Sequence, residues 1–155
     1  MARRRTRRRQ PSVPKQAGAI SVALQDFHIR GRFPTFAFHL NGGHAARWVG
    51  TLQPRETSQL YTVAIGYKLG RVPDVRVLSP TLQRNAPHVY PDGTLCLYWD
   101  EEWRWRRTEF IALTILPWTS LWLYHYELWL DTDEWLAPSS PHGLCKKPEV
   151  DASDD

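Results

Sequence analysis

The chain has 155 residues, a formal net charge of +4, eight tryptophans and two cysteines. This length fits one domain with a single core, and two cysteines do not imply a disulfide framework. Six arginines fall within residues 3–9, and setting them aside reduces the 20 basic residues to 14 against 16 acidic ones, so the basic character belongs to the N-terminal tail. We expect the cysteines to be unpaired and the setting to be the reduced cytoplasm.

Both ends of the chain are polar and are expected to be disordered. An arginine-rich tail is expected at 1–16 and a polar tail at 138–155, with one domain at 17–137 between them. No apolar run follows the arginines, so a secretory signal is not expected. The arginine tail either binds nucleic acid or another polyanion, or is a solvated extension.

The domain is expected to begin with an amphipathic helix at 17–30. Ile20, Leu24 and Phe27 recur there at a helical spacing, and Gly31 follows as a stop. Alternating apolar residues then indicate strands separated by turn residues. The four strand segments are 33–40, 46–54, 59–69 and 75–80. Because the turns between them are short, we expect an antiparallel meander.

A long irregular loop is expected at 81–106, followed by helices. Thr108 is expected to cap the first helical turn, and Pro117 to break or kink the helix, with a second segment from Trp118 to about Trp135. Aromatic residues at spacings of four and three predict a core-facing stripe made of Trp118, Trp122, Tyr126 and Trp129. Helix, strands, loop and helices in this order predict an α+β domain with one sheet.

The apolar stretch at 110–130 is long enough to raise the question of a membrane span. It contains Glu127 and His125, and such groups are costly in a lone span, so we expect buried helices and no membrane contact. His125 is expected to be a core histidine with its hydrogen bonds satisfied. The tryptophans of the preceding loop are expected to cover and fix it, and they are Trp99, Trp103 and Trp105.

One cysteine, Cys96, lies in the loop, three residues after Gly93, in the sequence PDGTLC. A tight turn followed by an extended segment puts the two leucines beside the cysteine on the core side. Thr94, Cys96 and Tyr98 are then expected on the other side, with the cysteine facing outward near His88. The alternative interpretation of Cys96 is a small buried hydrophobic residue.

The segment PHVYPDGTLCLYW, with the sheet before it, resembles the ubiquitin-conjugating enzymes. Residues 93–97 match that family's Gly-x-Ile-Cys-Leu, and Pro87 matches its proline nine residues before the cysteine. W-x-x-T-L-x-P at 48–54 resembles its second strand. The resemblance covers roughly residues 17–136 and implies an N-terminal helix, a four-stranded antiparallel meander, an active-site loop and C-terminal helices.

Two positions depart from the family's His-Pro-Asn. Ala86 replaces the histidine, which is mainly structural, and His88 replaces the asparagine credited with stabilising the oxyanion or ordering the loop. A histidine can donate a hydrogen bond to an oxyanion, worth about 3 kcal/mol of barrier, or act as a base. The family's tryptophan, eight residues after the cysteine, is matched only approximately by Trp103 and Trp105.

A longer pattern gives a closer resemblance. H-x-Y-P-D-G-T-L-C-L-Y, followed by I-x-P-W-T-x-x-W-L-x-x-Y-E-x-W and T-x-E-W, is similar to the E2-like proteins of cyclic-oligonucleotide-based antiphage signalling systems (CBASS) of the short type II kind. The resemblance implies that Cys96 forms a thioester with the C-terminal glycine of a cGAS/DncV-like nucleotidyltransferase. The acyl group would pass to a lysine or other amine and promote second-messenger synthesis, with His88 as oxyanion donor, base or loop organiser.

The rest of the sequence predicts neither a cofactor site nor a metal site. No phosphate-binding loop appears, so no cofactor is expected, and the carboxylate must be activated by a separate activating enzyme or by a direct route. His142 and Cys145 are too few for a metal site. The loop also contains four acidic residues, which either orient the attacking amine or form only a solvated edge of the loop. They are Asp92, Asp100, Glu101 and Glu102.

Three other functions stay open on the sequence alone. The first is a noncatalytic scaffold of the same fold that binds the nucleotidyltransferase, with Cys96 structural. The second is a cysteine hydrolase using Cys96 and His88, although no third orienting residue is evident. The third is a nucleic-acid binder acting through the arginine tail. The sequence also leaves a homodimer open.

Overall fold

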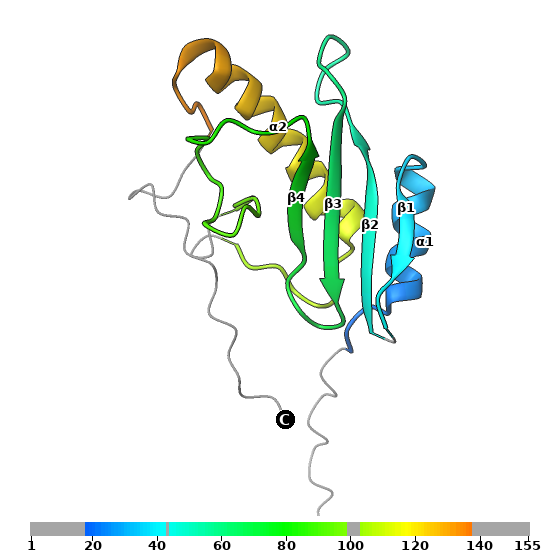
Figure 1. The fold of residues 1–155 in the computed structure, drawn as a ribbon. Coiled ribbons are helices and arrows are strands. Elements are labelled where there is room, and N and C mark those ends of the chain that lie inside the picture. The colour runs from blue at the N-terminus through cyan, green and yellow to red at the C-terminus, as the bar shows by residue number, and fades with distance from the viewer. Residues whose placement is uncertain (1–17, 43, 99–102, 138–155) are drawn as a thin grey trace, which may run out of the picture.

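The computed structural model describes residues 18–42, 44–98 and 103–137, which form an α+β domain (Figure 1). Its elements run in the order α1, β1, β2, β3, β4, a short 3-10 helix η1, and α2. The predicted α+β class is confirmed. The tails predicted at 1–16 and 138–155 lie outside the described residues.

Four antiparallel strands form one sheet in the order β1-β2-β3-β4, so the predicted meander is confirmed. The strands are β1 (Ala37–Leu40), β2 (Ala45–Leu52), β3 (Tyr61–Lys68) and β4 (Asp74–Ser79). Trp48 of β2 pairs with Ile65 of β3, which pairs with Val75 of β4, and all three are buried. Figure 1 shows α2 lying across this sheet and α1 beside β1.

Helix α1 (Val22–Arg32) begins at Ser21, whose hydroxyl accepts a 3.2 Å hydrogen bond from the N–H of Leu24. The helix passes through Gly31, the predicted stop, and ends one residue later. The side chains whose spacing predicted the helix are not its buried face, because Leu24 and Phe27 are 44% and 69% exposed.

The buried face of α1 contains Ile29 and two polar residues, and the polar residues are held by hydrogen bonds. Gln25 donates to the carbonyl of Glu109 at 2.8 Å and accepts from the N–H of Ile111 at 3.0 Å. The carboxylate of Asp26 accepts from the indole N–H of Trp48 at 3.0 Å. Because these buried groups have partners, the cost of burying them is offset. They join α1 to the sheet and to the segment before α2.

Helix α2 (Ile115–Thr132) follows η1 (Ile111–Leu113) and includes Pro117 in its first turn. The first four N–H groups of a helix have no intrahelical partner, so a proline is tolerated there. The predicted break at Pro117 is therefore wrong. Thr108 lies in a turn before η1 and makes no cap for either helix.

Aromatic residues of α2 and of the loop fill the core beside the sheet. Trp122, Tyr126 and Trp129 are buried, as the predicted stripe requires. Trp105 is also buried, with its ring centroid 5.8 Å from that of Tyr67, so its predicted role in fixing the loop is confirmed. Among the described residues, no helix has both the length and the apolar character that crossing a membrane requires.

Candidate active site

Residues 88–96 form a tight antiparallel turn, here called the Cys96 hairpin. The N–H of Tyr90 donates to the carbonyl of Thr94 at 2.8 Å, and the N–H of Cys96 donates to the carbonyl of His88 at 2.9 Å. His88 and Cys96 are therefore neighbours across the hairpin, and the structure brings the two predicted catalytic residues together.

The tip of the Cys96 hairpin is fixed by Asp92. Its Oδ1 accepts hydrogen bonds from the N–H and the hydroxyl of Thr94, at 2.9 and 2.6 Å. Gly93 follows with a φ of 83°, a conformation that glycine adopts at no steric cost. Arg76 of β4 donates to the carbonyl of Asp92 and holds the turn against the sheet. Asp92, a candidate for orienting an amine, thus forms the turn.

The segment after the turn is anchored on the core. Leu95 is buried, and its N–H donates to the carbonyl of Val75 in β4 at 2.8 Å. Leu97 also packs against the core, while Cys96 between them is half-buried. The leucines are therefore anchors, as predicted. Thr94, predicted to lie on the outer side, is buried instead because the turn interrupts the alternation.

The sulfur of Cys96 lies 3.7 Å from the carbonyl oxygen of Tyr98. Cys96 is disulfide-bonded in this structure, and no described cysteine is a free thiol. The prediction of unpaired cysteines is therefore wrong for Cys96, and Cys145 lies outside the described residues. Because the thiolate is the nucleophile, chemistry at Cys96 requires its reduction.

His88 has a left-handed backbone conformation with a φ of 55°, a region in which histidine and asparagine are enriched. Its carbonyl accepts a second hydrogen bond, from the indole N–H of Trp122 at 3.2 Å. Its ring centroid lies 4.8 Å from that of Trp135. Burial lowers the pKa of the His88 imidazole, so its neutral form predominates at neutral pH.

Three half-buried aromatic rings pack beside the segment that follows Cys96. The ring centroids of Tyr98 and Trp103 are 4.8 Å apart, and that of Trp118 lies 5.5 Å from Tyr98 and 4.6 Å from Trp103. Trp103 thus fixes the loop, as predicted. Trp118 departs from the predicted core stripe and instead connects the start of α2 to the cysteine segment.

His125 is half-buried, and its Nδ1 has no hydrogen-bond partner in the described part of the chain. The prediction of a satisfied core histidine is therefore wrong. Within residues 18–42, 44–98 and 103–137, no three histidine, cysteine or acidic side chains gather as a metal site would need. The remaining candidates lie outside the described residues, and they are Trp99, Asp100, Glu101, Glu102 and His142.

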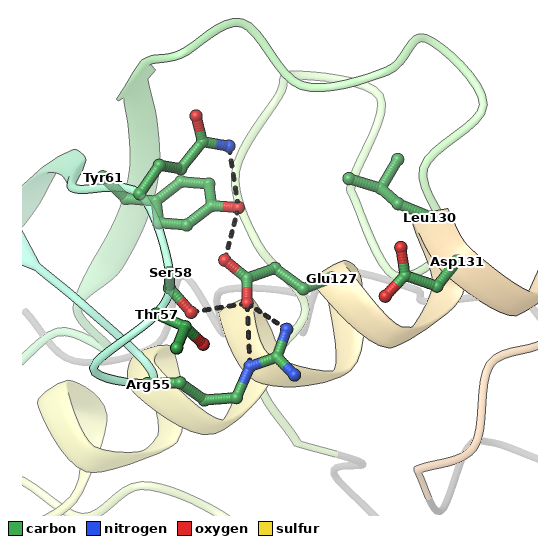
Figure 2. A pocket seen from close by; sticks show the side chains of 8 residues that line it. Arg55, Thr57, Ser58, Tyr61, Glu127, Leu130 and Asp131 are labelled. Carbon is green, nitrogen blue, oxygen red and sulfur yellow. Dashed lines mark hydrogen bonds and ion pairs between the residues drawn. The ribbon is translucent and has the colours of Figure 1, made fainter.

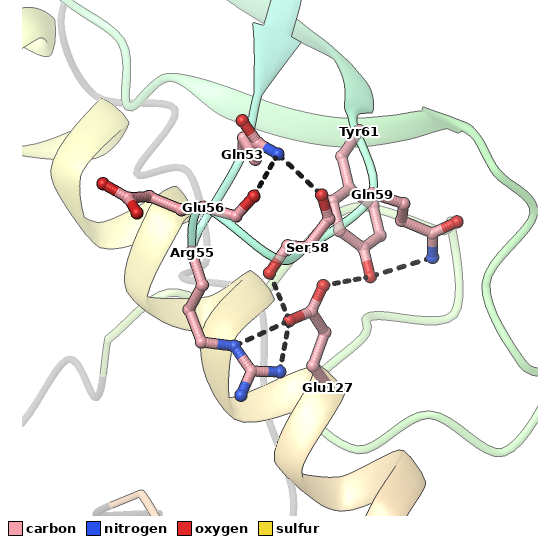
Figure 3. A network of polar contacts seen from close by, with 7 residues as sticks. All are labelled: Gln53, Arg55, Glu56, Ser58, Gln59, Tyr61 and Glu127. Carbon is pink, nitrogen blue, oxygen red and sulfur yellow. Dashed lines mark hydrogen bonds and ion pairs between the residues drawn. The ribbon is translucent and has the colours of Figure 1, made fainter.

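A second polar group of residues, which sequence reasoning did not single out, joins the β2–β3 loop to α2 (Figure 3). Glu127 of α2 accepts hydrogen bonds from Arg55 at 2.7 Å and Ser58 at 2.6 Å through one oxygen, and from Tyr61 at 3.1 Å through the other. We call these four residues the Glu127 cluster. Glu127, an acidic residue in the middle of the mostly apolar helix α2, was the signal in the sequence that could have identified it.

An open pocket of about 220 Å³ borders the Glu127 cluster (Figure 2). Its lining consists of Arg55, Thr57, Ser58, Gln59, Tyr61, Glu127, Leu130 and Asp131. No residue of the Cys96 hairpin contributes to it. Because the Glu127 carboxylate is already engaged by its own neighbours, we interpret the cluster as a brace between loop and helix.

The protonation states of the Glu127 cluster favour this brace. Burial opposes ionisation of Glu127, but hydrogen bonds from Ser58, Arg55 and Tyr61 outweigh it and lower the pKa of the carboxyl. Burial raises the pKa of Tyr61 to about 12. At neutral pH a charged carboxylate therefore accepts hydrogen bonds from protonated donors.

Comparison with known protein families identifies the family of the chain. The family model of type II CBASS E2 proteins matches residues 25–143 of the chain. The chain belongs to this family. A search of the curated proteins found no match. As a type II CBASS E2 protein the chain is E2-like and works with other CBASS components, which confirms that part of the sequence prediction.

Proposed function

We propose that this type II CBASS E2 protein is a cysteine acyltransferase with the fold of the ubiquitin-conjugating enzymes. Cys96 forms a thioester with the C-terminal glycine of a cGAS/DncV-like nucleotidyltransferase and passes the acyl group to an amine, which regulates second-messenger synthesis. The observation that carries the proposal is the Cys96 hairpin, in which the backbones of Cys96 and His88 are bonded at 2.9 Å, in a chain of this family.

In the first step, the reduced Cys96 thiolate attacks the activated carbonyl carbon of the glycine. A sulfur–carbon bond forms and the activating group leaves with its electron pair. Neutral His88 is suited to accept the thiol proton, because burial lowers the pKa of its imidazole. Before this step, cellular thiols reduce the Cys96 disulfide by thiol–disulfide exchange, and two of those thiols are oxidised to a disulfide in return.

The tetrahedral intermediate needs a donor for its oxyanion. The N–H of Cys96 is already bonded to the carbonyl of His88, so this amide is engaged elsewhere. The imidazole of His88 is therefore our first candidate for the donor, ahead of its roles as base and loop organiser. In each role, His88 supplies a hydrogen-bonding side chain at the position where the ubiquitin-conjugating enzymes have an asparagine.

In the second step, a lysine or other amine attacks the thioester. A carbon–nitrogen bond forms, the carbon–sulfur bond breaks, and the amine loses a proton to solvent or to His88. Cys96 is half-buried, so part of the residue stays accessible to an acceptor once the disulfide is reduced. Carboxylate activation belongs to a separate enzyme or to a direct route outside this chain. We place the catalytic domain at 17–137.

Co-expression with a cGAS/DncV-like nucleotidyltransferase of a type II CBASS system tests the proposal. Samples are treated with a phosphine to remove disulfides and then run on a gel without thiol. We expect a conjugate band that hydroxylamine or a thiol removes and that Cys96→Ala abolishes. Cys145→Ala is the matched control and should keep the band. A band that is unchanged in Cys96→Ala would refute the acyl-carrier role.

The disulfide-bonded state of Cys96 favours a second candidate, a noncatalytic scaffold that binds the nucleotidyltransferase. A scaffold would support second-messenger synthesis equally well with alanine at residue 96. Synthesis measured with the wild-type protein and with Cys96→Ala therefore separates the two functions. The acyltransferase predicts that Cys96→Ala loses the stimulation while binding of the nucleotidyltransferase persists.

A further inference from the structure

Trp122 of α2 is bonded to the backbone of the Cys96 hairpin. Its indole N–H donates to the carbonyl of His88 at 3.2 Å, and the same oxygen accepts the N–H of Cys96 at 2.9 Å. The Trp122 side chain is buried, with 4% of the residue exposed. One carbonyl therefore links the helix, the histidine and the cysteine.

His88 needs such support because its backbone is in the left-handed region, with a φ of 55°. A residue other than glycine stays there only when its surroundings hold it. Trp122 supports both the backbone and the side chain of His88. Its indole N–H binds the His88 carbonyl. Its ring centroid lies 5.6 Å from that of Trp135, and the Trp135 ring centroid lies 4.8 Å from that of the His88 imidazole.

We propose that Trp122 is a positioning residue, whose indole N–H holds His88 in the left-handed conformation and keeps its imidazole against Trp135. Without this bond, the backbone at residue 88 relaxes and the imidazole leaves its place. The catalytic consequence rests on the proposed acyl transfer, whereas the positioning itself does not. Trp122 acts only through His88.

Replacing Trp122 with phenylalanine removes the N–H and keeps an aromatic ring. Trp129→Phe is the matched control, since Trp129 is also buried in α2 and its ring contacts Tyr126, 5.8 Å away. NMR of the imidazole protons reports the position of His88, because the ring of Trp135 shifts their resonances. We expect Trp122→Phe to remove this ring-current shift and Trp129→Phe to keep it.

Activity is measured as the rate of thioester formation after reduction. We expect Trp122→Phe to lower this rate at least ~5-fold, which is less than the roughly 100-fold expected for complete loss of an oxyanion donor, because the imidazole is misplaced and not removed. The affinity for the nucleotidyltransferase, which supplies the acyl group, should stay within about twofold of the wild type, because Trp122 is proposed to act on the reaction step and not on binding. Equal resonances and equal rates in Trp122→Phe and Trp129→Phe would overturn the proposal.

A second substitution isolates the hydrogen bond if Trp122→Phe does not fold. The benzothiophene analogue of tryptophan at residue 122 has nearly the same shape and lacks only the N–H. It should reproduce the loss of ring-current shift and of rate, and unchanged His88 resonances would contradict the proposal. If the wild-type protein forms no conjugate, the acyl-transfer proposal fails, and the resonances still decide whether Trp122 positions His88.

Discussion

Replacing Glu127 with alanine is expected to destabilise the domain by about 3 kcal/mol. Ser58 and Tyr61 donate to its carboxylate at 2.6 and 3.1 Å, and each hydrogen bond to a charged group contributes about 1.5 kcal/mol. The ion pair with Arg55 adds little, because the Arg55 side chain is 40% exposed and solvent screens the pair. Glu127→Gln keeps the size of the side chain, and its free energy of unfolding should fall by about half as much as that of Glu127→Ala.

Urea denaturation and thermal unfolding measure this loss. At about 4 °C for each kcal/mol, the melting temperature of Glu127→Ala should fall by roughly 12 °C. Glu56→Gln is the control, since Glu56 is exposed on the same loop and its backbone carbonyl, not its carboxylate, accepts from Gln53. That variant should lie within about 0.5 kcal/mol of the wild type.

The pH dependence checks the sign of the Glu127 contribution. The pKa of Glu127 is lower in the folded protein than its ordinary value of 4.5. The carboxylate therefore contributes its full stability above pH 4.5, and this contribution is lost as the pH falls through the folded pKa. The stability difference between wild type and Glu127→Ala should shrink accordingly in acid. A difference that is small at pH 7, or that grows in acid, would refute the brace.

Four further outcomes are expected. His88→Ala should slow thioester formation about 100-fold, while His88→Asn retains most of the rate, as measured in single turnovers. Iodoacetamide should label Cys96 only after phosphine treatment, as read by peptide mass. Asp92→Ala should loosen the turn and slow transfer about 10-fold, which Asp92→Asn should partly restore. An ultraviolet titration should show one tyrosine, absent in Tyr61→Phe, ionising near pH 12.

The sheet could be predicted because its strands alternate and its turns are short. Helix α1 shows the limit of such patterns. Its apolar residues at helical spacing are exposed, and its buried face contains Gln25 and Asp26. Their partners, among them Glu109 and Trp48, are distant in sequence and come together only in the folded chain.

At the candidate site, too, local sequence patterns predicted some features and missed the contacts between residues distant in the sequence. Turn residues and the leucines around Cys96 predicted an outward-facing cysteine near His88; the hairpin joins the two backbones, and Cys96 itself is half-buried. The bond from Trp122 to His88 joins residues 34 positions apart, which no local pattern contains. The disulfide at Cys96 was also missed, because composition alone favoured unpaired thiols.

The most direct test of the acyl-carrier role is the intact mass of a trapped intermediate. Cys96→Ser, incubated with the nucleotidyltransferase and its activating components, should form a stable oxyester with a mass equal to the two chains minus one water. Tandem mass spectrometry should place the bond between residue 96 and the C-terminal glycine. No adduct on Cys96→Ser, together with undiminished conjugation by Cys96→Ala, would contradict the account.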